Sequence, residues 1–352
     1  MRNGLRVNAV KRLRHALSIG MAAALLAGCD MQPPIGTPAT MLRASAIAAP
    51  AHSGKSWVLP EAKSTKRLLY LSNGSDAVYV YDYDNGKQVG ELTGLDGTSG
   101  ECVDAKGDVY VANFTDGDVV EYARSSTKSL ATYRTNGNAI GCALDKNGDL
   151  AVADLYAFSS SSPGELCLWK HAKGNATCYM GGGPCFYVYP PGYDDKGNVI
   201  FEGQSDIATG VCAVLSGTSK ITTLNYSGAS CCGGGVTWDG KYIAVTDLEV
   251  VGSGVQTTIV RATLSGTTLT IRSETDLSDT CGVDGAVEVN APFIVGTKNT
   301  PVNDKQGMAL IGGNLADGCA SLAFWHYPKG GDPYRSVAGC APAGEAVSLA
   351  PK

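Results

Sequence analysis

The chain has 352 residues, of which 44% are hydrophobic and 17% are charged, so it has enough apolar residues for a globular core. Its 45 glycines, many beside Asn, Asp or Ser, indicate tight turns between short strands rather than a helical protein. Five of the 28 basic residues and no acidic residue lie in 1–29, which leaves 23 basic against 33 acidic residues in the remainder. An acidic chain with no run of Lys or Arg excludes nucleic acid as an expected partner.

The N-terminus carries a basic segment, residues 1–15, followed by an apolar segment, residues 16–28. The apolar segment is about 20 Å long as a helix, too short for a bilayer core of about 30 Å, and is typical of a signal peptide. Its end, Leu26-Ala27-Gly28-Cys29, resembles the lipobox of bacterial lipoproteins, which implies that the Cys29 thiol receives a lipid. We therefore expect an exported protein of the cell envelope, anchored through Cys29 to the inner or the outer membrane. The alternative is an ordinary cleaved signal with an incidental cysteine.

Residues 30–65 are rich in Pro, Ala, Ser and Thr and lack hydrophobic periodicity, which predicts a flexible tether. The predicted organisation is a signal peptide over 1–28, a lipidated cysteine with its tether over 29–65, and one domain over 66–352.

A repeat with a spacing of 40–50 residues runs through this domain. Each unit has a short apolar strand, a turn of Asp or Asn with Gly, and a second strand that ends in a polar residue. The units are GECVDAKGDVYVAN (100–113), GCALDKNGDLAVAD (141–154), GYDDKGNVIFE (192–202), GVTWDGKYIAVTD (235–247) and VEVNAPFIVGTK (287–298). Two further strands follow the second one, so the unit predicts a four-stranded antiparallel blade of a β-propeller.

The two ends of the domain indicate how the ring closes. Residues 68–73 match the second strand of a blade, with no first strand before them, and residues 344–349 match a first strand. The C-terminal strand is therefore expected to complete the first blade. Counting first strands near residues 101, 142, 192, 235, 286 and 346 predicts six blades in an all-β fold, with the join between the fifth and sixth the poorest fit to the pattern.

The segments VYVANFTDGDVVEY (109–122) and LAVADL (150–155) resemble the signature of NHL-repeat propellers, a group close to the YncE-like and SMP-30/gluconolactonase-like propellers. The resemblance covers about 66–352. It implies a six-bladed propeller but leaves the activity open, because this fold supports many functions.

Eleven cysteines remain after Cys29, and an exported protein is expected to pair several of them. Cys167 and Cys178 flank a turn at Lys173-Gly174-Asn175, so they are expected to face each other across a hairpin at disulfide distance. The neighbours Cys231 and Cys232 form either a vicinal disulfide or bonds to different partners, and an odd count leaves at least one cysteine without a partner in the chain.

In a propeller, the ends of the second strands open on one face of the ring. The polar residues expected there include Asn73 and Glu345, together with five candidate metal ligands: Glu101, Asn113, Asp154, Glu202 and Asp247. Such carboxylate and amide oxygens suit a hard cation such as Ca²⁺, and the SMP-30-like resemblance implies a metal site of this kind. Alternatively, an Asn or Asp at a strand end caps the following turn by accepting backbone hydrogen bonds.

Two functions from different classes follow. The first is a monomeric, membrane-tethered binding or scaffold propeller that recognises a protein, peptide or glycan, with the aromatic run 185–193 as a candidate contact surface. The second is an SMP-30-like, metal-dependent lactonase or other hydrolase that uses the carboxylates at the channel mouth. The four histidines give no pair that the sequence places together, so they offer no acid–base site.

Overall fold

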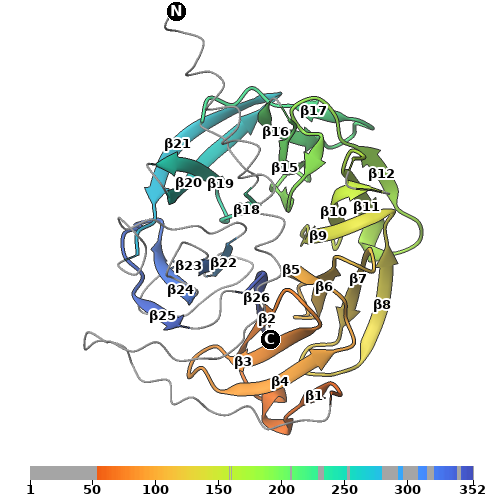
Figure 1. Ribbon diagram of the computed structural model, residues 1–352, viewed down its shortest axis with the longest axis vertical. Helices are drawn as coiled ribbons and strands as arrows, with labels where there is room; N and C mark the ends of the chain where they lie inside the picture. The colour runs from red at the N-terminus through yellow and green to blue at the C-terminus, as the bar shows by residue number, and fades with distance from the viewer. Residues whose placement is uncertain are drawn as a thin grey trace, which may run out of the picture.

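The computed structural model describes residues 54–351, apart from 158, 160, 207, 229–233, 252–253, 280–291, 296–307, 315–320 and 339–341. The described strands form six sheets, which are arranged as blades around a common axis (Figure 1). In each blade four successive strands run antiparallel from the centre of the ring to its edge. The structure therefore confirms the all-β, six-bladed propeller that the sequence repeat predicts.

The strands occupy equivalent places in the six blades. The inner strands are β26 (Gly344–Leu349), β5 (Thr98–Val103), β9 (Gly137–Leu144), β14 (Gly192–Tyr193), β18 (Val236–Trp238) and β22 (Phe293–Val295). The second strands are β2 (Arg67–Ser72), β6 (Val109–Asn113), β10 (Leu150–Ala157), β15 (Val199–Gln204), β19 (Ile243–Val251) and β23 (Met308–Asn314). The third strands are β3 (Ala77–Asp82), β7 (Asp118–Tyr122), β11 (Glu165–Trp169), β16 (Thr209–Val214), β20 (Gly254–Ser265) and β24 (Ser321–Tyr327). The outer strands are β4 (Gln88–Thr93), β8 (Ser129–Arg134), β12 (Thr177–Met180), β17 (Ile221–Thr223), β21 (Thr268–Asp276) and β25 (Arg335–Ala338).

Blade 4 has an additional short strand, β13 (Tyr187–Val188), which pairs with β15 beyond β14. Pro190 and Pro191 lie between these two strands. Because proline has no backbone N–H to donate to a sheet, the two prolines interrupt what is one continuous inner strand in the neighbouring blades.

The ring closes through the C-terminal strand. β26 pairs antiparallel with β2, with Leu69 opposite Val347, Leu71 opposite Glu345 and Ser72 opposite Gly344. The inner strands then contact one another in a complete circuit, β26–β5–β9–β14–β18–β22 and back to β26. The predicted closure of the first blade by the last strand is confirmed.

The sixth blade differs in detail from its sequence-based assignment. Residue 286, near which its first strand was expected, lies outside the described residues. In the described sheet the inner strand is Phe293–Val295, which the repeat had assigned to the second strand, and Met308–Asn314 takes the second place. The repeat is weak here because the second strand reads Ala-Leu-Ile-Gly-Gly-Asn, with two glycines where blade 2 has Val111 and Ala112.

Apolar cores fill the spaces between blades, one cluster at each of the six junctions. Side chains alternate across a strand, so successive residues enter different cores: Val109 and Val111 face blade 1, whereas Tyr110 and Ala112 face blade 3. Both faces of a blade are therefore buried, which is why the second strands are apolar almost throughout.

The turn between the first and second strands repeats as a side-chain motif. In blade 2, Asp104 Oδ1 accepts hydrogen bonds from the backbone N–H groups of Lys106 and Asp108 at 2.8 and 2.9 Å. Gly107 supplies the left-handed backbone conformation, φ 85°, that closes the turn. Asp145, Asp194 and Asp239 accept equivalent bonds in blades 3, 4 and 5.

Part of the segment assigned to the tether belongs to blade 1. β1 (Trp57–Val58) pairs with β4 as a fifth, outermost strand, and a short 3₁₀ helix, η1 (Pro60–Lys63), follows it. Ala62 is fully buried in the core between blades 1 and 2, and Trp57 Nε1 donates to Glu91 Oε2 at 3.2 Å. The folded domain thus begins before residue 66.

Three disulfides fasten blades 2, 3 and 4. Cys102–Cys142 joins the inner strands β5 and β9 of two blades, with a Cα–Cα distance of 5.7 Å. Cys167–Cys178, the pair favoured by the hairpin argument, joins β11 to β12 at directly opposite positions. The third bond, Cys185–Cys212, lies within blade 4. Cys29 and the five remaining cysteines (231, 232, 281, 319 and 340) lie outside the described residues.

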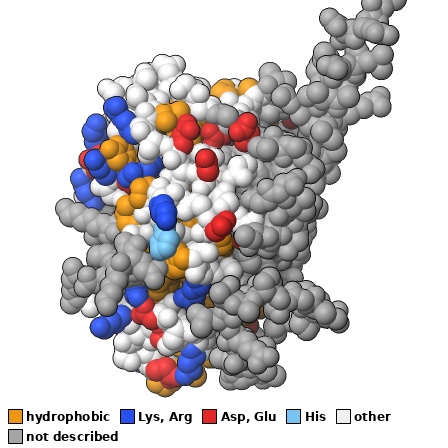
Figure 2. Space-filling view, turned by 90° about the vertical axis from the view of Figure 1, so that its left-hand side faces the viewer, with side chains coloured by type: hydrophobic (Ala, Val, Ile, Leu, Met, Phe, Trp, Pro, Cys, Tyr) orange, Lys and Arg blue, Asp and Glu red, His pale blue; other side chains and the backbone are white. Residues whose placement is uncertain are grey.

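Blades 5, 6 and 1 are joined by arginine side chains. Arg261 Nε lies 2.7 Å from the fully buried Asp239 carboxylate, and its guanidinium group lies over the rings of Tyr242 and Tyr327, at 4.5 and 5.5 Å from their centroids. Arg335 of blade 6 lies over Phe324 and donates to a backbone carbonyl of blade 1. The side of the ring that carries blades 5 and 6 shows basic, acidic and apolar side chains close together (Figure 2).

Candidate functional site

The ends of the second strands gather the candidate residues on one face of the ring. Asn113 ends β6, and Asp154, Glu202 and Asp247 occupy similar positions near the ends of β10, β15 and β19. Glu101 lies on the inner strand β5 of blade 2. All five side chains are buried, with at most 7% of any of these residues exposed.

Asn113 and Asn73 form hydrogen bonds with the loops at this face. Asn113 Oδ1 accepts a hydrogen bond from the backbone N–H of Asp96 at 2.6 Å, and its Nδ2 donates to Asp116 and Asp118. Asn73 Oδ1 accepts from the backbone N–H groups of Ser75 and Ala77. These contacts match the capping alternative, in which the side chain replaces backbone partners that the turn leaves unpaired.

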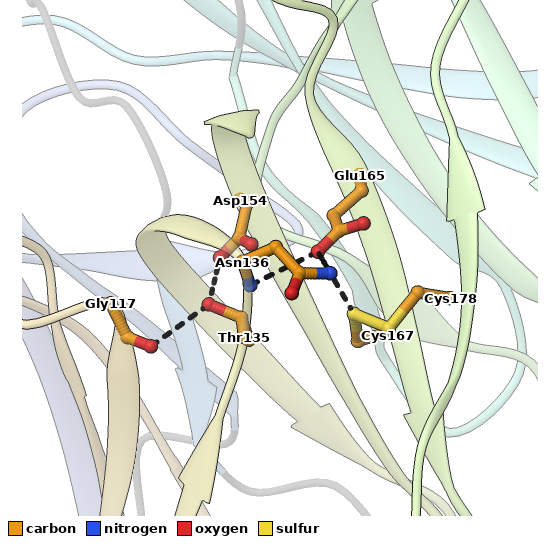
Figure 3. Close-up of a disulfide and its surroundings, with 7 residues drawn as sticks. All are labelled: Gly117, Thr135, Asn136, Asp154, Glu165, Cys167 and Cys178. Carbon is orange, nitrogen blue, oxygen red and sulfur yellow. Dashed lines mark hydrogen bonds between the residues drawn. A yellow bond between two sulfur atoms is a disulfide. The ribbon is translucent and has the colours of Figure 1, made fainter. Parts of the chain in front are cut away.

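Asp154 forms a buried carboxyl pair with Glu165 in blade 3 (Figure 3). The two residues lie directly opposite each other on β10 and β11. Asp154 Oδ1 accepts from Thr135 Oγ1 at 2.8 Å, and Glu165 Oε1 accepts from the backbone and the side chain of Asn136. Burial, together with the nearby charge of Glu165, raises the pKa of Asp154 to about 7. Asp154 therefore titrates near neutral pH.

A second carboxyl pair lies where blade 2 meets blade 1. Glu101 Oε1 accepts a hydrogen bond from Ser72 Oγ at 2.6 Å, and burial raises the pKa of Glu101 well above its usual value. Glu345 on β26 adds to this rise through its charge, and burial raises its own pKa in the same way. Burial therefore disfavours the charged form of both glutamates.

Glu202 and Asp247 lie near each other at the junction of blades 4 and 5. Asp247 Oδ2 accepts from the Tyr226 hydroxyl at 3.3 Å, and burial raises the pKa of Asp247 to about 6. Glu202 is fully buried, and its charge contributes to raising the pKa of Tyr226 after burial and Asp247. A Cβ atom at Gly234 would lie 2.7 Å from Glu202 Oε2, so this loop approaches the carboxylate as closely as only glycine permits.

The five candidate metal ligands are distributed over four blades, with Glu101 and Asn113 both in blade 2. Among the described residues, the group of three acidic, Cys or His side chains close enough to share an ion is Glu165 with Cys167 and Cys178. The two sulfur atoms of that group are joined in a disulfide, which removes the thiolates that a metal ion needs. One carboxylate oxygen each of Glu101, Asp154 and Asp247 has no hydrogen-bond partner in the described part of the chain.

An aromatic cluster lies on the same face, over blades 2, 3 and 4. We define it as Phe114, Tyr156, Phe186 and Tyr187, four half-buried residues next to or opposite the ends of the second strands. Phe114 contacts Tyr156 edge to face with ring centroids 6.0 Å apart, and Phe186 contacts Tyr187 in the same way at 5.1 Å. Tyr156 and Tyr187 are near enough that the first raises the pKa of the second, after burial and Asp206. Together the four rings form a surface that crosses three blades.

Sequence reasoning identified only part of this face. It singled out the run containing Phe186 and Tyr187 but missed Phe114 and Tyr156, which become neighbours only through the stacking of blades. It also missed Asn314, a fully buried residue that donates from Nδ2 to Asp279 at the end of the sixth second strand. The match between Gly312-Gly313-Asn314 and Val111-Ala112-Asn113 is the signal that identifies it.

The two histidines of the domain lie apart. His171 follows β11 in blade 3, where its Nδ1 lies 3.0 Å from the carbonyl oxygen of Asn147. His326 is on β24 in blade 6 and stacks on Tyr334, with ring centroids 4.5 Å apart. The two histidines therefore lie in different blades.

A groove of about 480 Å³ lies at the outer edge of the ring between blades 3 and 4. Its walls come from β12 and β17, the outermost strands of these blades. The lining residues include Cys178, Tyr179, Met180, Gly182, Lys220 and Ile221. Met180 is 45% exposed, which is unusual for a large apolar side chain in this domain.

Of the helices in the described residues, none has the length and apolar character to span a bilayer. Cys29 lies outside the described part of the chain, so its lipidation stays a prediction. The three disulfides indicate an oxidising, extracytoplasmic environment.

Comparisons with known proteins support the fold and no specific family. No family model matches the chain, and no curated protein matches it, so the NHL-like assignment stays a prediction. A protein of unknown function from Bacteroides caccae superposes with a TM-score of 0.54 at 12% identity, over 80% of this chain and 99% of that one. A functionally unknown protein from Desulfotomaculum acetoxidans gives 0.51 at 13% identity, over 84% and 89% of the two chains. A chain of a nidogen/laminin complex gives 0.51 at 9% identity, over 80% and 98%. The protein is thus similar to diverse β-propellers, a fold that commonly serves as a binding scaffold.

Proposed function

We propose that this protein is a binding module of the cell envelope, tethered to a membrane through Cys29, whose ligand contacts the aromatic cluster. The observation that carries the proposal is that Phe114, Tyr156, Phe186 and Tyr187 come from three blades and form one half-buried surface. Fixed aromatic rings offer a large apolar contact area and lose little conformational entropy when a ligand binds. A protein, peptide or glycan ligand fits this surface.

The scaffold under the cluster supports the same proposal. All three described disulfides lie in blades 2, 3 and 4, and Cys102–Cys142 fixes the inner strands of two of them to each other. A rigid support reduces the ordering cost of binding, because the rings are already held in place before the ligand arrives.

The binding face is tested with Tyr156→Ala combined with Tyr187→Ala. Wild type and variant are compared on a glycan array and on a peptide array, which separates the two ligand classes. We expect the double variant to lose the signals that wild type gives, by about tenfold or more in affinity, because aromatic anchors dominate such contacts. The matched control is Tyr334→Ala, a half-buried aromatic of blade 6, which should retain them. Equal loss in both variants, or in neither, contradicts the proposed face.

The tether is tested separately. Cys29→Ser should move the protein from the membrane fraction to the soluble fraction of the cell envelope, because stable anchoring depends on acyl chains. Unchanged partition of the variant would show that Cys29 is not the anchor. This result leaves the aromatic cluster untouched, so the two parts of the proposal fail independently.

A second proposal is a metal-dependent hydrolase that uses the buried carboxylates. It is favoured by the unpartnered oxygens of Glu101, Asp154 and Asp247, which suit a hard cation such as Ca²⁺. Metal analysis of the purified protein should then find a stoichiometric ion that is lost in Asp154→Ala and in Glu101→Ala. Protein that contains no such ion after dialysis against Ca²⁺ or Zn²⁺ would exclude it.

A further inference from the structure

The Cys167–Cys178 disulfide differs from the other two in the exposure of its cysteine residues. Cys167 is fully buried, whereas Cys178 is exposed and lines the groove between blades 3 and 4. In the other two disulfides every cysteine is buried, with exposed fractions between 0 and 8%. A thiolate attacks a disulfide by approaching one sulfur, so access to that sulfur decides which bond reacts.

The groove gives an attacking thiol a path to Cys178. The groove is an open depression with a volume of about 480 Å³. Lys220 on the opposite wall supplies a positive charge, which favours the thiolate form of an entering thiol. Met180 and Ile221 supply apolar contacts beside it.

On the buried side of the bond, a hydrogen-bond acceptor lies close to Cys167 Sγ. Glu165 Oε1 lies 3.5 Å from Cys167 Sγ (Figure 3). A disulfide sulfur carries no hydrogen, so this approach becomes a hydrogen bond only when the bond opens and Cys167 acquires a proton. The product of reduction therefore finds its acceptor already in place.

The fold also tolerates the opened bond. β11 and β12 stay paired through four opposite positions, from Glu165 opposite Met180 to Leu168 opposite Thr177. β12 is the outermost strand of its blade, so movement of Cys178 leaves the cores between blades intact.

We propose that Cys167–Cys178 is a site of thiol–disulfide exchange, at which a low-molecular-mass thiol enters the groove and forms a mixed disulfide with Cys178. The thiolate forms a bond to Cys178 Sγ, the bond between the two cysteines breaks, and its electron pair goes to Cys167 Sγ, which takes a proton from water. A second thiol releases the first as a small disulfide and leaves both cysteines reduced. The reaction is independent of the aromatic cluster and of the tether.

The test uses the folded, full-length protein without any substitution. It is treated with increasing dithiothreitol or reduced glutathione, alkylated, and mapped by mass spectrometry, while circular dichroism monitors the fold. We expect Cys167 and Cys178 to be labelled together at reductant concentrations that leave Cys102, Cys142, Cys185 and Cys212 unlabelled. Simultaneous labelling of all six, or none before unfolding, overturns the proposal.

Two variants locate the reaction in the groove. Cys167→Ser leaves a free Cys178, which should form a mixed disulfide with oxidised glutathione, a mass increase that Cys212→Ser, with its buried Cys185, should not show. Gly182→Phe should slow reduction of wild-type disulfide several-fold, because Gly182 lines the groove and has open space where a side chain would start. Ser129→Phe, on the exposed outer strand of blade 2, is the control for added bulk and should leave the rate unchanged. Equal rates in Gly182→Phe and Ser129→Phe would show that the thiol does not enter here.

Discussion

Among the described residues, sulfur–sulfur bonds hold strands together in blades 2, 3 and 4, whereas at the junctions of blades 5, 6 and 1 arginine side chains lie against aromatic rings. Cys231, Cys232, Cys281, Cys319 and Cys340 lie outside this part of the chain. The apolar cores are alike in both halves, one cluster at each junction. A disulfide acts mainly by restricting the unfolded chain, and it is insensitive to salt. An arginine in this setting acts in the folded state, through charge and ring contacts that desolvation makes strong.

The difference bears on function, because the aromatic cluster lies over the disulfide-bonded half. A surface that binds a ligand gains from a support that does not shift with ionic strength or protonation. The arginine-joined half lies away from that cluster. Four predictions test how disulfides, arginine contacts and other charged groups differ in their effect on the stability of the domain.

The largest effect is expected from the disulfide between blades. Replacing Cys102 and Cys142 with alanine should lower the free energy of unfolding by about 4 kcal/mol, because the bond spans 40 residues of sequence. Replacing Cys167 and Cys178, which span 11 residues, should cost about 3 kcal/mol. Urea denaturation without reductant measures both. A larger loss from the second pair would show that loop length does not govern these bonds.

The arginine-joined half should respond to Arg261→Met. This substitution leaves the buried Asp239 without its cation and removes the contacts over Tyr242 and Tyr327, so we expect a loss of about 3 kcal/mol. Arg261→Lys restores the charge but not the planar contact, and should recover part of the loss. Thermal unfolding of the three proteins checks the order. Full recovery with lysine would assign the whole effect to charge.

Asp154 introduces a pH dependence into the disulfide-bonded half. An Asp carboxyl in the unfolded chain ionises near pH 4, and in the folded protein the pKa of Asp154 is about 7. Between these values the folded protein keeps a proton that the unfolded chain has released, so stability falls as pH rises from about 4 to about 7 and is level above that range. Asp154→Asn should remove roughly 3 kcal/mol of this fall. Denaturation at pH 4.5 and 8 measures it, and a variant with the same slope as wild type would contradict it.

The smallest effect is expected at an exposed ion pair. Lys87 Nζ lies 2.9 Å from Glu61 Oε1, with about half of each side chain exposed. Lys87→Met should change stability by less than about 0.5 kcal/mol, because water and salt screen such a pair. It is the matched control for Arg261: a comparable loss from both would mean that burial does not set the strength of the arginine contacts.

The fold could be predicted from short sequence segments, because each blade is formed by consecutive strands of the chain. The Asp-Gly turns at Asp104, Asp145 and Asp194 repeat as the same set of hydrogen bonds, so their spacing counts blades directly. The closing strand, residues 344–349, was predicted because its sequence matches the first strand of a blade, and it pairs with β2. The sixth blade was placed less well, since its second strand contains Gly312 and Gly313 where the matching strand of blade 2 has Val111 and Ala112.

The candidate site was harder to predict, because it depends on contacts between blades. The position of Asp154 at the end of a strand was visible, but its partner Glu165 lies on the next strand and carries no repeat signal. Phe114 and Tyr156 are 42 positions apart and meet only when blades 2 and 3 stack. The Cys167–Cys178 bond was accessible to reasoning because a hairpin brings the two residues together, whereas Cys102–Cys142 joins two blades and was not assigned.

The closure of the ring by β26 sets the order in which the chain matures. Until Gly344–Leu349 has been synthesised, β2 has an unpaired edge, and the core between blades 6 and 1 lacks Val347. Exposed edges and apolar faces of this kind are the usual sites of aggregation and of chaperone binding. Closure of the ring therefore waits for β26, and a chain that stops before it is expected to be removed by quality control rather than to persist with an incomplete first blade.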